Sequence, residues 1–283
     1  MLHNVTAIIF TKNESTRLPL VLENLTGFSK IIVFDGGSSD NTEQICRDFN
    51  VEFVVRPLHL RDIVGGDYQF AFNYIDTEYV LNVNCSHFYP KALLDAFREV
   101  ATSSSHSAVY HDVLIYSFGS LVHRPFFRRR SSATNFYRVD AVNFQKRIVH
   151  NEAPVIVSAS EKLILPAVDE LSIHLFRDYD VKKSESNHSF YSTQDANLRF
   201  NRGIRTNLFK IFFYPLKHFI HQYIRCGSIR YGIHGLVYSI TFAQLEMAIQ
   251  FKIWELQNDL GLNSTILKNV SSRTLLFKKY FDK

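Results

Sequence analysis

The chain has 283 residues, of which 46% are hydrophobic and 21% are charged, and its formal net charge is +5. This composition fits a well-packed soluble protein with one large domain or two smaller ones. The three cysteines form no CxxC pair, which excludes the usual zinc-site spacing and fits a reducing compartment. The N-terminus MLHNVTAIIF lacks the basic and long apolar segments of a signal peptide, so we expect none.

The first hundred residues alternate between predicted strands and predicted helices. The strands are short apolar runs rich in β-branched residues, as expected where both faces of a sheet are covered. We predict strands at residues 5–10, 30–35, 51–57 and 79–83, and helices at residues 18–25, 43–50 and 67–76. This alternation predicts an α/β fold with a mixed, mostly parallel sheet flanked by helices.

The pattern changes after residue 105. Short strand-like pieces up to residue 175 indicate an antiparallel or mixed extension of the sheet, interrupted by the basic run Arg124 to Arg130. Residues 178–195 are polar, so we expect a loop that leads into a helix, and the chain from residue 206 onward is expected to be helical. We therefore predict a catalytic domain at residues 1–195 and a C-terminal helical segment at residues 196–283.

Polar residues follow two of the predicted strands at the point where each strand ends. Asp35 ends KIIVFD and is followed by GGSSDNT, whose glycines permit a tight turn before a helix N-terminus. Such a carboxylate can bind a ribose or a base, and the helix N-terminus favours a phosphate. The first strand ends on Thr11, with Asn13 and Glu14 in the adjacent loop. The two units together therefore indicate a nucleotide site.

Purely structural roles remain open for the same residues. Asp35 can start an Asx turn, and Asp40 can cap the following helix. Thr11 and Glu14 can form a capping box.

The segments AIIFTKNE, KIIVFDGGSSDNTEQIC and VVRP resemble the start of family 2 glycosyltransferases of the GT-A fold. The likeness is strongest to the subgroup of lipopolysaccharide-core glucosyltransferases, and it extends more loosely to about residue 255. In that family, the first loop and the aspartate of the second strand hold the nucleotide of a nucleotide sugar. The resemblance therefore implies a nucleotide-sugar site, to which we assign Thr11, Asn13, Glu14, Asp35, Gly36, Asp40 and Asn84.

The chain departs from the family at the end of the strand 79–83. The family's Asp-x-Asp motif, which binds a divalent cation at the donor phosphates, is replaced by Asn84-Cys85-Ser86-His87. Mg²⁺ or Mn²⁺ remains an open cofactor, but hard cations prefer carboxylates, so we assign no metal ligand.

Three alternatives remain for this corner. The first is a metal-independent transferase in which arginines stabilise the departing diphosphate, with Arg56, Arg61 and the Arg124–Arg130 run as candidates. The second is a metal site that recruits Asp67 or Asp112. The third is a degenerate protein that binds its ligand but turns over poorly.

An inverting transferase also needs a general base for the acceptor hydroxyl. The resemblance aligns the IVHNEAPV segment with a family His-Glu pair. We assign Glu152 as the base and His150 to orienting or acceptor binding. The alternative is that both residues lie on a solvated loop.

Residues 196–245 contain no Asp or Glu and seven basic residues, which are Arg199, Arg202, Arg205, Lys210, Lys217, Arg225 and Arg230. Aromatic residues recur at helical spacing from Phe209 onward. This pattern is typical of a basic amphipathic helix on an anionic membrane surface. The apolar stretch 233–251 is long enough to span a bilayer, but Glu246 lies within it, so we expect helices that lie on the surface. The alternative is a helical hairpin packed on the catalytic domain.

The sequence thus predicts an inverting glycosyltransferase, cytoplasmic and peripheral on the inner face of a bacterial plasma membrane. We expect a nucleotide-sugar donor and a lipid-linked or cell-surface glycan acceptor, as in lipopolysaccharide biosynthesis. The alternative is a non-catalytic protein that binds a nucleotide sugar or a glycan. A nucleic-acid partner is not expected, because no RNP, KH or helix-turn-helix pattern is present.

Overall fold

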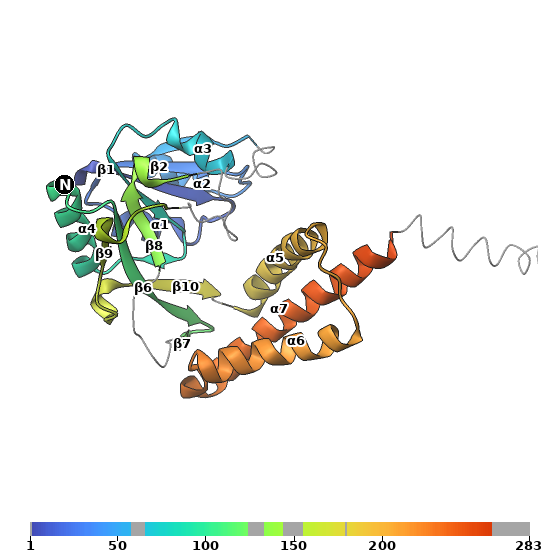
Figure 1. The fold of residues 1–283 in the computed structure, drawn as a ribbon. Helices are drawn as coiled ribbons and strands as arrows, with labels where there is room; N and C mark the ends of the chain where they lie inside the picture. Colours follow the sequence, from blue (N-terminus) through green and yellow to red (C-terminus); the bar gives the residue numbers. More distant parts are fainter. Residues whose placement is uncertain (1, 58–65, 124–132, 144–154, 179, 262–283) are drawn as a thin grey trace, which may run out of the picture. The chain divides into compact units, whose positions relative to one another are not determined.

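The computed structural model describes residues 2–57, 66–123, 133–143, 155–178 and 180–261 (Figure 1). The chain divides into two compact units. The sheet unit comprises residues 1–116 and 127–177, and the helical unit comprises residues 117–126 and 178–283.

The sheet unit contains the predicted parallel core. Strands β1 (Leu2–Thr11), β2 (Phe28–Asp35), β3 (Glu52–Val55) and β4 (Tyr79–Val83) pair in parallel in the order β3-β2-β1-β4. Thr11 pairs with Asp35, and Ile9 pairs with Val83, so the carboxyl ends of β1, β2 and β4 share one edge. Ligands of open α/β sheets bind beyond such an edge.

The sheet continues through an antiparallel strand, as the change of pattern predicted. The order beyond β4 is β8 (Ala133–Arg138), β6 (Ala108–Ser117), β10 (Ser172–Asp178) and β5 (His87–Phe88). Strand β8 is antiparallel to both β4 and β6, β5 is antiparallel to β10, and β9 (Lys162–Ile164) pairs in parallel with β6. The predicted mixed α/β sheet is confirmed.

Helices lie on both faces of the central strands, so the apolar side chains on each face of these strands are buried. The helices are α1 (Leu18–Asn24), α2 (Thr42–Asp48), α3 (Gly66–Phe72) and α4 (Lys91–Ser103). One buried cluster joins Leu22 of α1 and Phe97 of α4 to β1 and β4, and the other joins Tyr68 of α3 to Ile8 and Phe34. Burial on both faces explains why these strands read as continuous apolar runs.

The helical unit is built from α5 (Val181–Asn201), α6 (Leu208–Ile220) and α7 (Gly232–Asn258), with the short strand β7 (Ser120–His123). A π-helical turn at His221–Arg225 and a 3₁₀ turn at Ser228–Tyr231 join α6 to α7. The prediction of a loop at residues 178–195 is wrong, because α5 occupies most of this segment. The predicted domain boundary after residue 195 also falls inside α5, whereas the helical unit resumes at Asp178.

Tertiary contacts explain the helical state of this polar segment. Lys252 of α7 donates to the hydroxyls of Ser192 and Thr193, both at 2.7 Å. Arg199 at the end of α5 forms a two-pronged ion pair with Glu246, at 2.8 and 3.1 Å. Contacts of this kind override weak intrinsic helix propensity.

The acidic residue in the apolar stretch 233–251 has a structural partner. Glu246 is 2% exposed, pairs with Arg199 and accepts a hydrogen bond from Gln250 at 2.7 Å. Among the described helices, none has the length and apolar character needed to cross a membrane.

Candidate functional site

Asp35 lies at the carboxyl end of β2 with both carboxylate oxygens engaged. Oδ2 accepts from the backbone N–H groups of Gly37 and Ser38, each at 2.7 Å, and this is the Asx-type turn that the sequence left open. Oδ1 accepts from the hydroxyls of Thr11, at 3.1 Å, and Ser38, at 2.5 Å. Gly37 has a φ of 80°, a backbone conformation that glycine adopts without strain. Asp35 therefore organises the turn, at 2% exposure.

Thr11 is not the N-cap of a helix, so the capping-box alternative is wrong. It is the last residue of β1, and α1 begins only at Leu18. Its hydroxyl bonds to Asp35, and its carbonyl accepts from the N–H of Gly36 at 2.9 Å. Thr11 thus connects the two strand ends.

Hydrogen bonds tie the loop after β1 to the loop after β2. The N–H of Asn13 donates to Ser38 Oγ at 2.7 Å, and the Asn13 side-chain oxygen accepts from the N–H of Ser39 at 2.8 Å. Asn13 has a φ of 55°, which asparagine tolerates better than most residues. The N–H of Glu14 donates to Thr42 Oγ1 at 3.3 Å. The two loops therefore form one structure, here called the paired loops (residues 11–17 and 36–42).

Asp40 belongs to the same network at the start of α2. Its carboxylate accepts from the N–H and hydroxyl of Thr42, at 3.1 and 2.5 Å, and from the N–H of Ser15 at 3.0 Å. Desolvation alone would raise the pKa of Asp40, but the hydrogen bonds from Thr42 and Ser15 outweigh it and hold the pKa at about 2. Asp40 is therefore ionised at neutral pH.

Arg17, which the sequence analysis did not single out, fastens the paired loops to β10. Its guanidinium pairs with Glu14 at 2.6 and 2.8 Å and reaches the carbonyls of Phe176 and Arg177, each at 3.4 Å. The i,i+3 spacing of Glu14 and Arg17 could have indicated their ion pair from the sequence. The contact of Arg17 with β10 could not be found in this way, because it joins residues 159 or 160 positions apart.

The corner after β4 has a different chemistry. Asn84 is exposed, and its amide lies 3.3 Å from His87 Nε2. His87 Nδ1 lies 3.2 Å from the Tyr89 hydroxyl, and this hydroxyl accepts from the side chain of Asn135 at 2.8 Å. Asn135 Oδ1 lies 2.6 Å from His111 Nε2. We call this chain of side chains the strand-four relay.

The histidines of the strand-four relay are neutral. Burial, together with the nearby His111 and Arg17, lowers the pKa of His87 to about 3. Burial also lowers the pKa of His111. The corner that carries two carboxylates in the family pattern is thus uncharged in this chain.

The donor set at this corner does not fit a hard divalent cation. Asn84, Cys85 and Ser86 supply an amide, a thiol and a hydroxyl, and no carboxylate. Asp67, one of the alternatives, pairs with buried Arg56 at 2.6 Å. Within the part of the chain that the structure describes, no cluster of three or more His, Cys, Asp or Glu side chains is arranged to hold a metal ion.

Arg56 does not fit a phosphate-binding role either. It is 8% exposed, pairs with Asp67, and lies 5.2 Å from the centre of the Phe10 ring. Asp112, the other alternative ligand, lies on β6 and accepts from the N–H of Val113 at 2.9 Å.

Several predicted residues lie outside the described part of the chain. These are His150, Glu152, Arg61 and the Arg124–Arg130 run.

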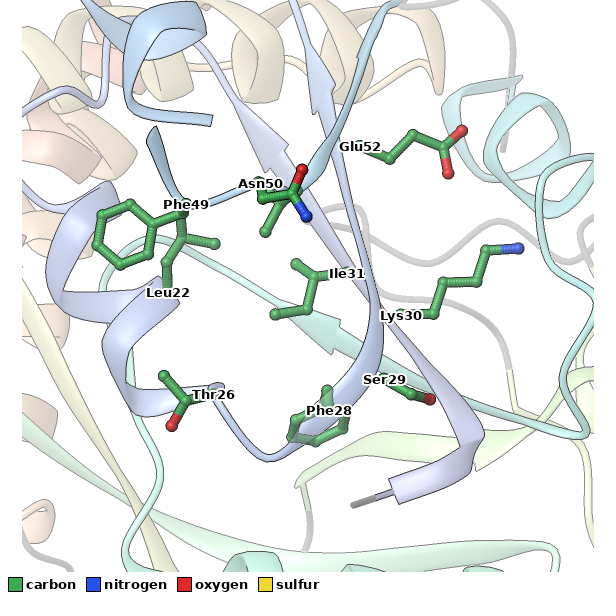
Figure 2. A pocket seen from close by; sticks show the side chains of 10 residues that line it. Leu22, Thr26, Phe28, Ser29, Lys30, Ile31, Phe49, Asn50 and Glu52 are labelled. Carbon is green, nitrogen blue, oxygen red and sulfur yellow. The ribbon is translucent and has the colours of Figure 1, made fainter. Parts of the chain in front are cut away.

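A surface depression of about 400 Å³ lies away from the sheet edge at which β1, β2 and β4 end (Figure 2). Phe28, Ser29, Lys30 and Ile31 line it, at the amino end of β2, whereas Asp35 ends the strand. Lys30 is engaged by Asp76 at 2.8 Å. The depression is therefore not part of the candidate site.

The sequence model of Glycosyl transferase family 2 matches residues 6–158. The chain belongs to this family. The match begins inside β1 and includes β2 and β4, and family membership together with the observed sheet confirms the GT-A type of fold predicted from the sequence. The chain is therefore a glycosyltransferase.

Two relatives of this glycosyltransferase match along most of its length. An uncharacterized glycosyltransferase of Rickettsia conorii is 22% identical over 253 residues, covering 84% of this chain and 86% of the relative. The lipopolysaccharide core biosynthesis glycosyltransferase LpsC of Rhizobium meliloti is 22% identical over 259 residues, covering 89% and 92%.

Solved structures are similar over a smaller part of the glycosyltransferase. The glucosyl-3-phosphoglycerate synthase of Mycobacterium tuberculosis is 15% identical with a TM-score of 0.33, covering 39% of this chain and 45% of that chain. The match thus spans less than half of the solved protein.

Proposed function

We propose that this glycosyltransferase takes a sugar from a nucleoside-diphosphate donor held at the paired loops. The observation that carries the proposal is the Asp35 turn, which joins the ends of β1 and β2 at the carboxyl edge of the sheet. A ribose hydroxyl can replace the Ser38 hydroxyl at Asp35 Oδ1, because a carboxylate oxygen accepts any well-placed O–H donor. Asn13, Glu14 and Asp40 keep the two loops together.

The donor diphosphate is proposed to bind without a divalent cation. The neutral strand-four relay supports this reading, because it offers amide and imidazole groups and none of the carboxylates that Mg²⁺ and Mn²⁺ prefer. Asn84, exposed at the end of β4, would contact the donor through its amide.

Transfer is proposed to proceed with inversion in a single displacement. The acceptor hydroxyl attacks the anomeric carbon, the base takes the hydroxyl proton, and the bond from that carbon to the diphosphate oxygen breaks. Glu152 is our proposed base, and His150 is proposed to orient the acceptor. Glu152→Gln should lower kcat by at least about 100-fold while leaving donor affinity unchanged, because the amide cannot accept the proton.

The donor proposal is tested by titrating a panel of UDP, GDP and CDP sugars calorimetrically. Ser38→Ala removes one hydroxyl that donates a hydrogen bond to Asp35 and should change donor affinity, whereas the matched variant Ser105→Ala, in the segment after α4, should not. Binding of a donor without any transfer or hydrolysis would favour the non-catalytic alternative. Failure of every donor to bind would contradict the proposal.

The acceptor is proposed to be a lipid-linked glycan reached at an anionic, cytoplasmic membrane surface. Five apolar side chains of α6 are more than half exposed: Leu208 (73%), Phe209 (61%), Phe212 (66%), Phe213 (51%) and Leu216 (51%). Lys210 and Lys217 lie on the same helix. Apolar exposure beside basic residues suits an anionic lipid interface. The similarity to LpsC supports a role in lipopolysaccharide assembly.

Flotation with vesicles tests the membrane proposal. The chain should float with phosphatidylglycerol vesicles and remain in the lower fraction with phosphatidylcholine alone, because the basic residues require anionic lipid. Phe209→Ser with Phe212→Ser should abolish flotation, and Phe190→Ser on α5 is the matched control, since Phe190 is also exposed (53%). Equal flotation of all variants would contradict this part of the proposal.

A further inference from the structure

Four rings gather where β6, β10 and β5 meet in the sheet unit. The Tyr116 ring stacks with His174, at a centroid distance of 5.6 Å, and with Phe176, at 4.8 Å. Phe88 of β5 pairs directly with His174 of β10, which puts the two side chains on one face of the sheet. Phe88 is 46% exposed and Phe176 is 49% exposed. We call these four residues the aromatic shelf.

Hydrogen bonds fix the orientation of the rings at the base of the aromatic shelf. His174 Nε2 lies 3.1 Å from the carbonyl oxygen of Asp169, so this nitrogen carries the hydrogen. His174 Nδ1 is then an acceptor, and the Tyr116 hydroxyl donates to it at 3.1 Å. A ring held in this way loses little conformational entropy when a ligand binds to the aromatic shelf.

The aromatic shelf borders the candidate site through backbone contacts. The N–H of Phe176 donates to the carbonyl of Ser86 at 2.7 Å, in the segment that replaces the family's Asp-x-Asp motif. The carbonyl of Phe176 accepts from Arg17, which is paired with Glu14 of the paired loops. Phe176 is therefore connected to both sides of the donor site.

We propose that the aromatic shelf is a subsite for a hexose ring of the glycan acceptor. A sugar has an apolar face of C–H groups, which are attracted to the electron-rich face of an aromatic ring, while its hydroxyls need polar neighbours. The half-exposed Phe176 ring supplies the apolar contact, and the adjacent Ser86, whose carbonyl accepts from the N–H of Phe176, supplies a polar neighbour. This inference rests on the proposed function, because the subsite serves that transfer reaction.

A tryptophan reporter tests the subsite directly. The single tryptophan, Trp254, lies on α7, so Phe176→Trp with Trp254→Phe places the only indole on the aromatic shelf. Core oligosaccharide released from lipopolysaccharide by mild acid should produce a saturable change in fluorescence. The matched control is Phe190→Trp with Trp254→Phe, which should not respond. No response in the first variant, or equal responses in both, would overturn the subsite.

Kinetic measurements distinguish aromatic stacking on the Phe176 ring from a general apolar contact at the same position. Phe176→Ala and Phe176→Leu should each raise the acceptor KM about 10-fold with kcat nearly unchanged, whereas Phe176→Trp should keep the wild-type KM. Wild-type KM in Phe176→Leu would overturn the stacking role. Donor binding, measured calorimetrically on the same variants, should stay intact. If the wild-type chain bound no donor, the proposed function would be contradicted. The fluorescence experiment would still show whether the aromatic shelf binds the oligosaccharide.

Discussion

The two units of this glycosyltransferase distribute polar and apolar side chains in opposite ways. The sheet unit buries apolar residues on both faces of its central strands and keeps polar groups such as Asp35 at the strand ends. The helical unit buries Glu246, the acidic partner of Arg199, and exposes the aromatic side chains Phe209, Phe212 and Phe213 of α6. The small apolar cluster of Ala196, Ile249 and Ile253 is its described core.

This difference indicates that the two units depend on different interactions for stability. Apolar burial contributes broadly in the sheet unit, so single surface changes there should cost little. The helical unit depends on a few close contacts, and removal of one should cost much more.

The largest effect is expected at Gly235, at the start of α7, where the helix packs against the 3₁₀ turn that precedes it. A Cβ on Gly235 would lie 1.8 Å from the backbone oxygen of Ser228, which cannot move aside alone. Gly235→Ala should lower the free energy of unfolding by about 3 kcal/mol or more, measured by urea denaturation. The matched control is Gly27→Ala in the sheet unit, where an added Cβ would lie 3.8 Å from Arg98 Nη2, at the end of a flexible side chain. Equal stability of the two variants would contradict the contrast.

The next effect concerns buried charge in the helical unit. Glu246→Ala should cost about 2–4 kcal/mol of unfolding free energy, because Arg199 loses a buried partner. Glu43→Ala in the sheet unit removes an exposed ion pair with Arg47 and should cost less than about 0.5 kcal/mol. Similar losses in both variants, measured by thermal and urea unfolding, would show that the helical unit does not depend on its ion pair.

A smaller, pH-dependent effect is expected from His87 in the sheet unit. Its pKa falls from 6.5 to about 3 on folding, so the unfolded chain binds the proton more tightly. The stability that this neutral imidazole contributes is complete above pH 6.5 and is lost as the pH falls toward 3, by at most about 1.4 kcal/mol per pH unit. When the pH is lowered from 7 to 5, the free energy of unfolding of His87→Gln should therefore fall by up to about 2 kcal/mol less than that of the wild type.

The helical unit offers the comparison for this pH effect. Desolvation lowers the pKa of His218, although Glu246 opposes the shift, and the His218 side chain is 46% exposed. Stability should again fall as the pH is lowered, as for His87. Because the His218 side chain is more exposed, the effect of His218→Gln on this pH dependence should be smaller. Urea unfolding at pH 7 and pH 5 measures both variants, and a steeper loss in His87→Gln than in wild type would contradict the assignment.

Local patterns predicted most of the sheet unit. The strand expected at residues 79–83 has those same bounds in β4, because a run buried on both faces has few alternatives. The Asx-type turn at Asp35 was among the roles that turn chemistry left open, whereas the hydrogen bonds that join the paired loops were not predicted. Helix α5 was missed because its polar residues have no apolar periodicity, and contacts with α7 stabilise it.

The neighbours of the candidate site could not be predicted from local patterns. Arg17 contacts the carbonyl of Phe176, and Asn135 connects the carbonyl of Asn82 to the Tyr89 hydroxyl. These contacts join residues far apart in the chain, and no local spacing encodes them. The missing carboxylates after β4 were visible in the sequence, but the neutral relay that occupies the corner was not.

Donor hydrolysis with and without chelator tests most directly whether the strand-four corner works without a metal. Each nucleotide sugar of the panel would be incubated with the full chain in EDTA or in Mn²⁺, and the released nucleotide measured. We expect rates that agree within about 2-fold in the two conditions, because no carboxylate at Asn84–Ser86 binds a cation. Hydrolysis that EDTA abolishes and Mn²⁺ restores would contradict the account.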